Sequence, residues 1–281
     1  MTLTDLLSQY VAVERIKKGG QKTVFKAKNK HGQIVALKII SNATDPRVIQ
    51  EIEIVKNLNI SNVPSILENG IVTDEAVDEE ALYIIEEYVD GISLRDWINA
   101  GNKADLAFAY SLLETLLSTE MQLENKQILH RDINPNNIII GSNGVIYLID
   151  FGLAKLLGGT SLTQTGAIHG PFTPGYAPHE QFANIKLAQD VRTDLFQIGV
   201  TIYECITGKN PFVKANDTLL QIMSRTMTYA PPSLTIAGDA NGMFSMLLNM
   251  LIAKNQSQRP DTAADAMRYL QATKTTLVLG G

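Results

Sequence analysis

The residues best suited to chemistry stand in an order that matches the needs of phosphoryl transfer. This reaction requires a lysine that binds phosphates, oxygen ligands for magnesium, and a carboxylate that orients the attacking hydroxyl. Lys38 supplies the cation, and Asp132, Asn137 and Asp150 supply the oxygen atoms. The last three stand on either side of two short apolar runs, Ile138 to Ile140 and Val145 to Leu148. The sequence therefore offers, in order, the residue types that metal-assisted phosphoryl transfer requires.

Strand patterns dominate the first third of the chain and predict an antiparallel sheet. The expected strands are Tyr10 to Ile16, Thr23 to Lys28, Gln33 to Ile40, Ser65 to Val72 and Ala81 to Tyr88. His31-Gly32 marks a hairpin turn between the second and third strands. Between the third and fourth strands, apolar residues at helical spacing predict a helix from Pro46 to Leu58, with Asp45 as its N-cap.

Helical patterns dominate the rest of the chain. The expected helices are Ala104 to Leu123, Thr193 to Thr207, Met243 to Ala253 and Thr262 to Ala272. The runs Ile138 to Ile140 and Val145 to Leu148, joined by Gly141 to Gly144, predict a β-hairpin. We therefore expect an α+β protein with a sheet unit at residues 1–89, a mainly helical unit at residues 90–272 and a tail at residues 273–281.

Composition excludes several classes of function. The 281 residues carry 24 Lys plus Arg against 29 Asp plus Glu, and the net charge of -5 argues against a nucleic-acid or anionic-lipid partner. Cys205 is the single cysteine, which excludes an intramolecular disulfide and fits a reducing compartment. The start of the chain lacks a leader pattern, and no apolar stretch approaches the length of a membrane span. We therefore expect a cytoplasmic protein with no membrane partner.

Four motifs carry a resemblance to a known family. The run from His130 to Asn137 resembles the catalytic loop of protein kinases, and Asp150-Phe151-Gly152 resembles the metal-binding motif that follows it. Val35 to Lys38 looks like the strand that ends in the phosphate-binding lysine, and Phe172 to Glu180 looks like the substrate-docking loop. Over Ile16 to Arg259, the sequence is identified as a member of the eukaryotic-like (Hanks-type) serine/threonine protein kinases. Its sequence pattern is similar to that of bacterial members of the family.

The resemblance implies a two-lobed kinase fold, ATP with Mg2+ or Mn2+ as cofactors, and a role for each motif residue. Asp132 would be the catalytic base, and Asn137 and Asp150 would bind the metal. Lys38 would bind the α- and β-phosphates and pair with Glu51 on the following helix. Glu53 is the alternative partner, but it lies about 200° around the helix from Glu51, so the two cannot both face the lysine.

The resemblance also places the nucleotide. The adenine slot would be formed by Ile16, Val24, Ala36 and Ile139, and the connecting segment by Glu87, Tyr88 and Val89. Glu86 then stands at the back of the pocket, where the family commonly has an apolar or hydroxyl side chain. A buried carboxylate there is costly unless a hydrogen-bond donor pairs with it. The alternative is that the Glu86 side chain narrows the rear of the pocket.

The chain departs from the family pattern at two places. Of the three glycines in the phosphate-covering loop, only the middle one is kept. It is Gly19, with Gly20 beside it, and the loss of the other two lowers the expected affinity for ATP. Asn134 stands where serine/threonine kinases usually carry a lysine that contacts the transferred phosphate. An asparagine there can donate a hydrogen bond but cannot neutralise charge, so we expect weakened or specialised activity.

Other motif residues have expected roles in the scaffold and in regulation. Glu180 would pair with Arg259, Asp194 would brace the catalytic loop, and Thr173 would serve substrate docking. Arg131 would bind a phosphate on the activation segment. That phosphate is expected within Ser161 to Thr165, with Thr165 as the first choice and Thr163 as the second.

Two alternatives remain open from the sequence. A pseudokinase that binds nucleotide or acts as a scaffold would explain both departures from the pattern, although the retained lysine, base and metal ligands argue against it. A small-molecule kinase shares the same acidic residues, but Arg131, the docking loop and the pair of Glu180 with Arg259 favour a protein substrate. The expected partner is a protein with a serine or threonine acceptor, and autophosphorylation is a further option.

Overall fold

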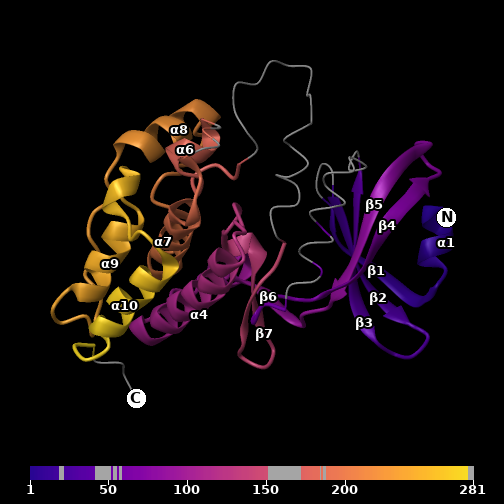
Figure 1. Cartoon of the computed structure of the whole chain (residues 1–281), viewed down its shortest axis with the longest axis horizontal. Coiled ribbons are helices and arrows are strands. Elements are labelled where there is room, and N and C mark those ends of the chain that lie inside the picture. The colour runs from indigo at the N-terminus through magenta and orange to yellow at the C-terminus, as the bar shows by residue number, and fades with distance from the viewer. Residues whose placement is uncertain are drawn as a thin grey trace. The chain divides into compact units, whose positions relative to one another are not determined.

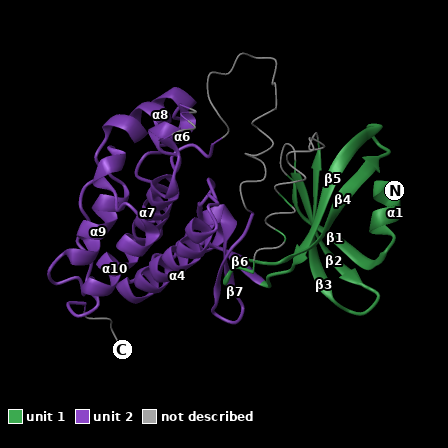
Figure 2. Cartoon of the chain, viewed as in Figure 1, with its two compact units in different colours: residues 1–90 green, residues 91–281 purple. Residues whose placement is uncertain are grey.

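The computed structural model describes residues 1–18, 22–41, 52, 56, 59–150, 172–183, 185 and 188–277. The chain divides into two compact units, residues 1–90 and residues 91–281 (Figure 2). Unit 1 is built on an antiparallel sheet and unit 2 is mostly helical (Figure 1). The expected α+β class is therefore confirmed.

The sheet of unit 1 has the order β1-β2-β3-β5-β4, and all neighbouring strands are antiparallel. Its strands are β1 (Tyr10–Lys18), β2 (Lys22–Asn29), β3 (Ile34–Ser41), β4 (Ile66–Asp74) and β5 (Glu79–Glu87). The β2–β3 hairpin turns at His31-Gly32 as predicted, with Gly32 at a φ of 83°. The Asn29 side-chain oxygen closes this turn by accepting from the backbone N–H groups of His31 and Gln33, each at 3.0 Å.

A short helix that the sequence analysis did not predict, α1 (Leu3–Leu7), packs on this sheet. Thr2 and Asp5 form a reciprocal capping box at its start. Leu6 is buried in the same apolar cluster as Leu37 and Tyr83. The predicted helix from Pro46 to Leu58 lies outside the described residues, except for Ile52 and Lys56.

The alternation of side chains along β3 separates the site from this core. Leu37 and Ile39 point into the cluster with α1. Ala36 and Lys38 therefore point to the opposite face of the sheet, which is the face expected to bind a nucleotide.

Unit 2 contains the small sheet β6-β7-β8 and a set of packed helices (Figure 1). Its elements are β6 (Gly91–Ser93), α3 (Leu94–Asn99), α4 (Leu106–Asn125), the 3-10 turn η1 (Pro135–Asn137), β7 (Ile138–Gly141), β8 (Ile146–Leu148), α6 (His179–Phe182), α7 (Val191–Thr207), α8 (Leu219–Thr228), α9 (Met243–Leu251), the 3-10 turn η3 (Gln256–Gln258) and α10 (Ala263–Thr273). The four predicted helices correspond to α4, α7, α9 and α10. None of the helices in the described part of the chain is long and apolar enough to cross a membrane.

Helix α7 is the buried centre of unit 2 and packs against α4 and α9. It starts at the N-cap Asp190, whose carboxylate accepts from the Arg192 N–H at 2.9 Å. It ends at Gly208, which adopts the left-handed conformation that favours glycine. Because α7 is almost entirely buried, side chains on its first turns have fixed positions beneath the predicted catalytic loop.

The predicted hairpin of β7 and β8 is present and carries β6 on its outer edge. Gly91 of β6 lies so close to β7 that a Cβ atom there would stand 2.2 Å from the Ile140 carbonyl oxygen. Ile139 pairs with Ser93 of β6 and with Tyr147 of β8. The hairpin therefore holds the segments before and after it, which contain Asn137 and Asp150.

Candidate active site

Side chains of α7 hold the loop from His130 to Asn137 by hydrogen bonds to its backbone. The fully buried Asp194 carboxylate accepts from the backbone N–H groups of His130 and Arg131, each at 2.7 Å. The Gln197 side chain accepts from the Ile133 N–H at 2.7 Å. The first two of these bonds join Asp194, which we expect to brace the catalytic loop, directly to the backbone of that loop. Sequence reasoning missed Gln197, which lies one helical turn further along α7.

Arg131 adopts a left-handed backbone conformation with a φ of 61°. Its carbonyl oxygen accepts from the side-chain amides of Gln181 at 2.8 Å and Gln197 at 3.0 Å. Because this conformation is unfavourable for a side chain of this size, these bonds are needed to hold the bend in the loop. The bend lies directly before Asp132.

The Asp132 carboxylate is held at both oxygens. Its Oδ1 accepts from the Thr173 hydroxyl at 2.5 Å, and its Oδ2 accepts from the Asn137 amide at 3.0 Å. The same amide donates to the Asp132 carbonyl oxygen at 2.9 Å. The structure thus brings together three predicted site residues that lie up to 41 positions apart.

Asn137 and Asp150 offer the oxygen atoms that a hard divalent cation prefers. The backbone N–H of Ile149 donates to the Asn137 carbonyl oxygen at 2.8 Å, so the residue before Asp150 is tied to Asn137. The Asn137 amide nitrogen is turned toward Asp132, and its amide oxygen is the atom suited to a cation. Both residues therefore fit magnesium, whose sites commonly use one or two carboxylates together with phosphate oxygens.

Asn134 lies within the loop. Its amide donates to the Asp132 carbonyl oxygen at 2.9 Å, and its side-chain oxygen accepts from the Asn136 N–H at 3.0 Å as the N-cap of η1. The residue is only 2% exposed. In the structure its side chain therefore caps η1 and bonds within the loop.

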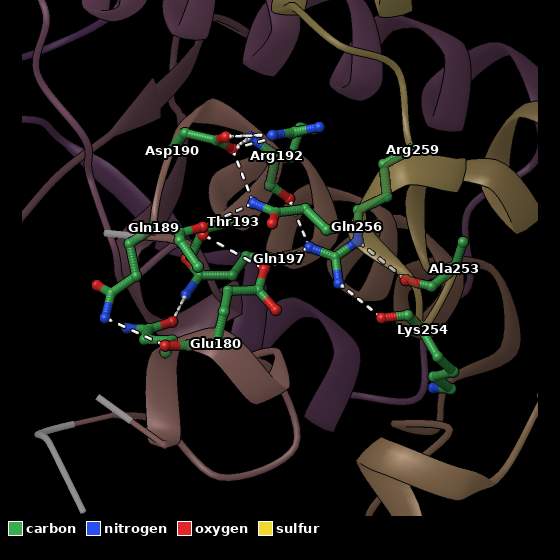
Figure 3. Close-up of polar contacts among 12 residues, drawn as sticks. Glu180, Gln189, Asp190, Arg192, Thr193, Gln197, Ala253, Lys254, Gln256 and Arg259 are labelled. Atoms are coloured by element: carbon green, nitrogen blue, oxygen red, sulfur yellow. Dashed lines mark hydrogen bonds and ion pairs between the residues drawn. The ribbon is translucent and has the colours of Figure 1, made fainter. Parts of the chain in front are cut away.

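Glu180 and Arg259 form the expected buried ion pair, at 2.6 Å (Figure 3). The guanidinium also donates to the carbonyl oxygens of Arg192 at 3.0 Å and Ala253 at 2.9 Å. Burial lowers the pKa of Arg259, and the Glu180 carboxylate opposes that effect. The pair joins α6, at the end of the docking loop, to the start of α7 and the segment before α10.

A second ion pair beneath the docking loop was not predicted. Arg95 of α3 binds Glu204 of α7 at 2.8 Å, and the Tyr176 hydroxyl donates to the same carboxylate. Burial raises the pKa of Tyr176, and the negative charge of Glu204 adds to this effect. Arg95 and Glu204 lie 109 positions apart, and no local pattern in the sequence relates them.

In unit 1, Lys38 forms an ion pair with Glu86 of β5, and both side chains are buried. Glu51, the expected partner, lies outside the described residues. Gly19, Gly20, Thr163 and Thr165 also lie outside them, as do Phe151 and Gly152. The carboxylate that the sequence marked as unusual thus has a donor, and that donor is the predicted phosphate-binding lysine.

The remaining residues expected around the nucleotide differ in how far their side chains are buried. Val24 lies opposite Lys38 in the sheet and is buried, whereas Ile16 is 48% exposed. Glu87 ends β5, and its carboxylate accepts from the Ser65 N–H at 3.0 Å. Its side chain therefore fixes the chain that enters β4.

This fold and catalytic loop define a protein kinase domain, and a model of that domain matches residues 10–270. The chain belongs to the protein kinase family. It is 30% identical to the probable serine/threonine-protein kinase PknB of Bifidobacterium longum over 267 residues, which are 92% of this chain and 38% of that protein. It is 32% identical to the serine/threonine-protein kinase PrkC of Bacillus subtilis over 184 residues, 63% of this chain and 27% of that protein. It is 28% identical to the serine/threonine-protein kinase RUNKEL of Arabidopsis thaliana over 254 residues, 90% of this chain and 18% of that protein.

The chain therefore spans well under half the length of the relatives that it matches. These relatives are serine/threonine-protein kinases by name, and they come from bacteria and a plant.

Proposed function

We propose that the chain transfers the γ-phosphoryl group of ATP to serine or threonine hydroxyls of proteins. One observation carries the proposal: the Asp132 carboxylate accepts a hydrogen bond from the Thr173 hydroxyl in a loop held by Asp194. This carboxylate is oriented toward a hydroxyl group. The catalytic base of a kinase must likewise be oriented toward the hydroxyl group of its substrate.

In the proposed reaction, Asp132 orients the substrate hydroxyl and accepts its proton while that oxygen bonds to the γ-phosphorus. The bond from this phosphorus to the β–γ bridging oxygen breaks, and ADP leaves with that oxygen. Lys38 holds the α- and β-phosphates, and Val24 and Ala36, on the same face of the sheet, contact adenine. Mg2+ or Mn2+ held by Asn137 and Asp150 would neutralise phosphate charge.

A cytoplasmic location, where ATP is available, fits this activity. The proposed activation step is phosphorylation of Thr165 or Thr163, with Arg131 as the group that binds the phosphate.

The proposal is tested by incubating the purified chain with labelled ATP, Mg2+ and a generic protein acceptor. We expect transfer by the wild type and its loss in Asp132→Ala and Asp150→Ala. Asp78→Asn, which changes an exposed carboxylate in a turn of unit 1, is the matched control and should retain transfer. Absence of transfer by the wild type, with retained ADP binding, would favour a pseudokinase.

One observation favours that second candidate. Asn134 replaces the lysine common in serine/threonine kinases, and its side chain is turned into the loop. Phosphosite mapping after the same incubation separates the candidates, since a pseudokinase binds nucleotide without producing any phosphorylated serine or threonine.

A further inference from the structure

The ion pair of Lys38 and Glu86 lies within the sheet of unit 1. In the antiparallel pairing of β3 and β5, Ala36 stands opposite Glu86 and Lys38 stands opposite Ile84. Lys38 and Glu86 are therefore diagonal neighbours on one face of the sheet, within reach of each other's long side chains. Their side chains are 5% and 9% exposed.

The residues that lie opposite this pair on the neighbouring strands of the sheet are apolar. Val24 lies opposite Lys38 on β2, Ile66 lies opposite Glu86 on β4, and both are buried together with Ile84. A charge without water in such surroundings is costly unless an opposite charge and hydrogen bonds compensate it. Glu86 thus supplies part of what keeps the ammonium group of Lys38 stable inside unit 1.

The proposed function creates a conflict at this pair, and the following inference rests on that function. ATP and ADP bring several negative charges to Lys38. The ammonium group has three N–H donors and can bind a phosphate and a carboxylate together. The Glu86 carboxylate would nevertheless repel the phosphates and neutralise the cation that attracts them.

We infer that Glu86 is an affinity-setting residue that competes with the nucleotide phosphates for Lys38. It stabilises the nucleotide-free protein, in which Lys38 needs a counter-ion, more than it stabilises the nucleotide complex, in which the phosphates serve as counter-ions. The carboxylate therefore weakens phosphate binding and favours release of ADP. Glu86 acts through Lys38, so its effect depends on the phosphates and not on the base or the ribose.

Isothermal titration calorimetry of the full chain with ADP and with adenosine, both with Mg2+, tests this inference. In Glu86→Gln we expect ADP to bind about tenfold more tightly, a size typical of coupling between neighbouring charged groups. The affinity for adenosine should stay the same. In a Lys38→Met background, the change of Glu86 to Gln should have no effect on ADP affinity.

Glu80→Gln is the matched control, because it removes an exposed carboxylate from the other end of β5. It should leave both affinities unchanged. Unchanged or weaker ADP binding by Glu86→Gln would overturn the inference, and so would an equal gain for adenosine. Failure of the wild type to bind ADP would contradict the proposed function itself, and the inference with it.

Loss of the carboxylate also lowers the stability of the nucleotide-free protein in this account. Thermal unfolding of Glu86→Gln should therefore show a lower Tm than the wild type without ADP and a larger rise on adding ADP. If Glu86→Gln does not fold, Glu86→Met carries the same two measurements, since a methionine fills similar space without a charge. A Met variant with wild-type affinity for ADP overturns the inference.

Discussion

Three side chains, two from the catalytic loop and one from the docking loop, form hydrogen bonds to Asp132. Asn137 donates to one oxygen, Thr173 donates to the other, and Asn134 donates to the backbone carbonyl. Each bond to an ionised group contributes more than a bond between neutral groups. The orientation of the Asp132 carboxylate therefore depends on side chains from two separate segments.

Thr173→Val is expected to lower kcat by roughly ten- to a hundredfold, because it removes a hydrogen bond to an ionised group. The fold should be unaffected, since valine matches threonine in shape. Steady-state kinetics with saturating ATP measure the effect, and Thr173→Ser, which keeps the hydroxyl, should retain most of the turnover. Wild-type kcat in the valine variant would contradict the role of this contact.

Arg259→Ala is expected to lower the free energy of unfolding by roughly 3–5 kcal/mol, because it leaves the Glu180 carboxylate buried without its partner. The Arg259 side chain is 1% exposed. Urea unfolding followed by circular dichroism measures the change. Arg268→Ala removes an exposed arginine from its pair with Asp265 and should change stability little, so equal effects of the two variants would contradict the prediction.

At the scale of elements, the sequence predicted helices α4, α7, α9 and α10 but not the short helices α1, α3 and α6, nor α8. Helices α4 and α7 carry apolar residues over several turns, and both were predicted. Helix α8 was missed, although Thr218 and Gln221 form a capping box at its start. Leu219, Ile222 and Met223 recur at helical spacing along it, and Met223 is buried, so this helix had a sequence signal that the prediction overlooked.

The sheet of unit 1 contains a glycine whose absent side chain makes room for a ring. Gly70 of β4 lies opposite Tyr83 of β5, and a Cβ atom at Gly70 would stand 2.8 Å from the Tyr83 ring. Burial raises the pKa of Tyr83 to about 12, and its hydroxyl donates to Glu68 at 2.7 Å. The ring is therefore held over the glycine by packing and by a hydrogen bond.

Gly70→Ala is expected to lower the free energy of unfolding by about 1–3 kcal/mol, the usual cost of overpacking. In a Tyr83→Leu background, the same change should be neutral or stabilising, because the ring is gone and alanine suits a strand better than glycine does. Chemical unfolding of the four proteins forms a double-mutant cycle. Equal effects of Gly70→Ala in both backgrounds would show that the ring is not the cause.

At the scale of the whole molecule, the contacts that join distant segments were the ones least visible in the sequence. The pair of Glu180 and Arg259 was found through the family pattern, whereas Arg95 with Glu204 had no pattern to reveal it. The pair of Lys38 and Glu86 needed the register of β3 and β5, since a shift by one residue would turn either side chain to the other face. Register depends on the packing of the complete sheet, so it could not be deduced from either strand alone.

The free energy of unfolding as a function of pH is also a property of the whole molecule. We expect one buried carboxyl group, that of Glu120, to have a large effect on it. Glu120 of α4 is fully buried, and neither of its oxygens has a hydrogen-bond partner in the described part of the chain. Burial raises the pKa of Glu120 well above its usual value, and the nearby carboxylates of Asp194 and Glu124 raise it further. The group is therefore protonated in the folded protein at pH values where it is ionised in the unfolded chain.

Because the folded pKa is raised, the stability linked to Glu120 is fully present below the unfolded pKa of about 4.5. It is lost as the pH rises from that value through the folded pKa. Glu120→Gln keeps the shape and cannot ionise, so its stability advantage over the wild type should grow as the pH is raised from 4 to 8. Urea unfolding at several pH values measures this difference, with Glu114→Gln on the same helix as the control. A difference between Glu120→Gln and the wild type that stays constant over this range would show that Glu120 is ionised in the folded protein as easily as in the unfolded chain.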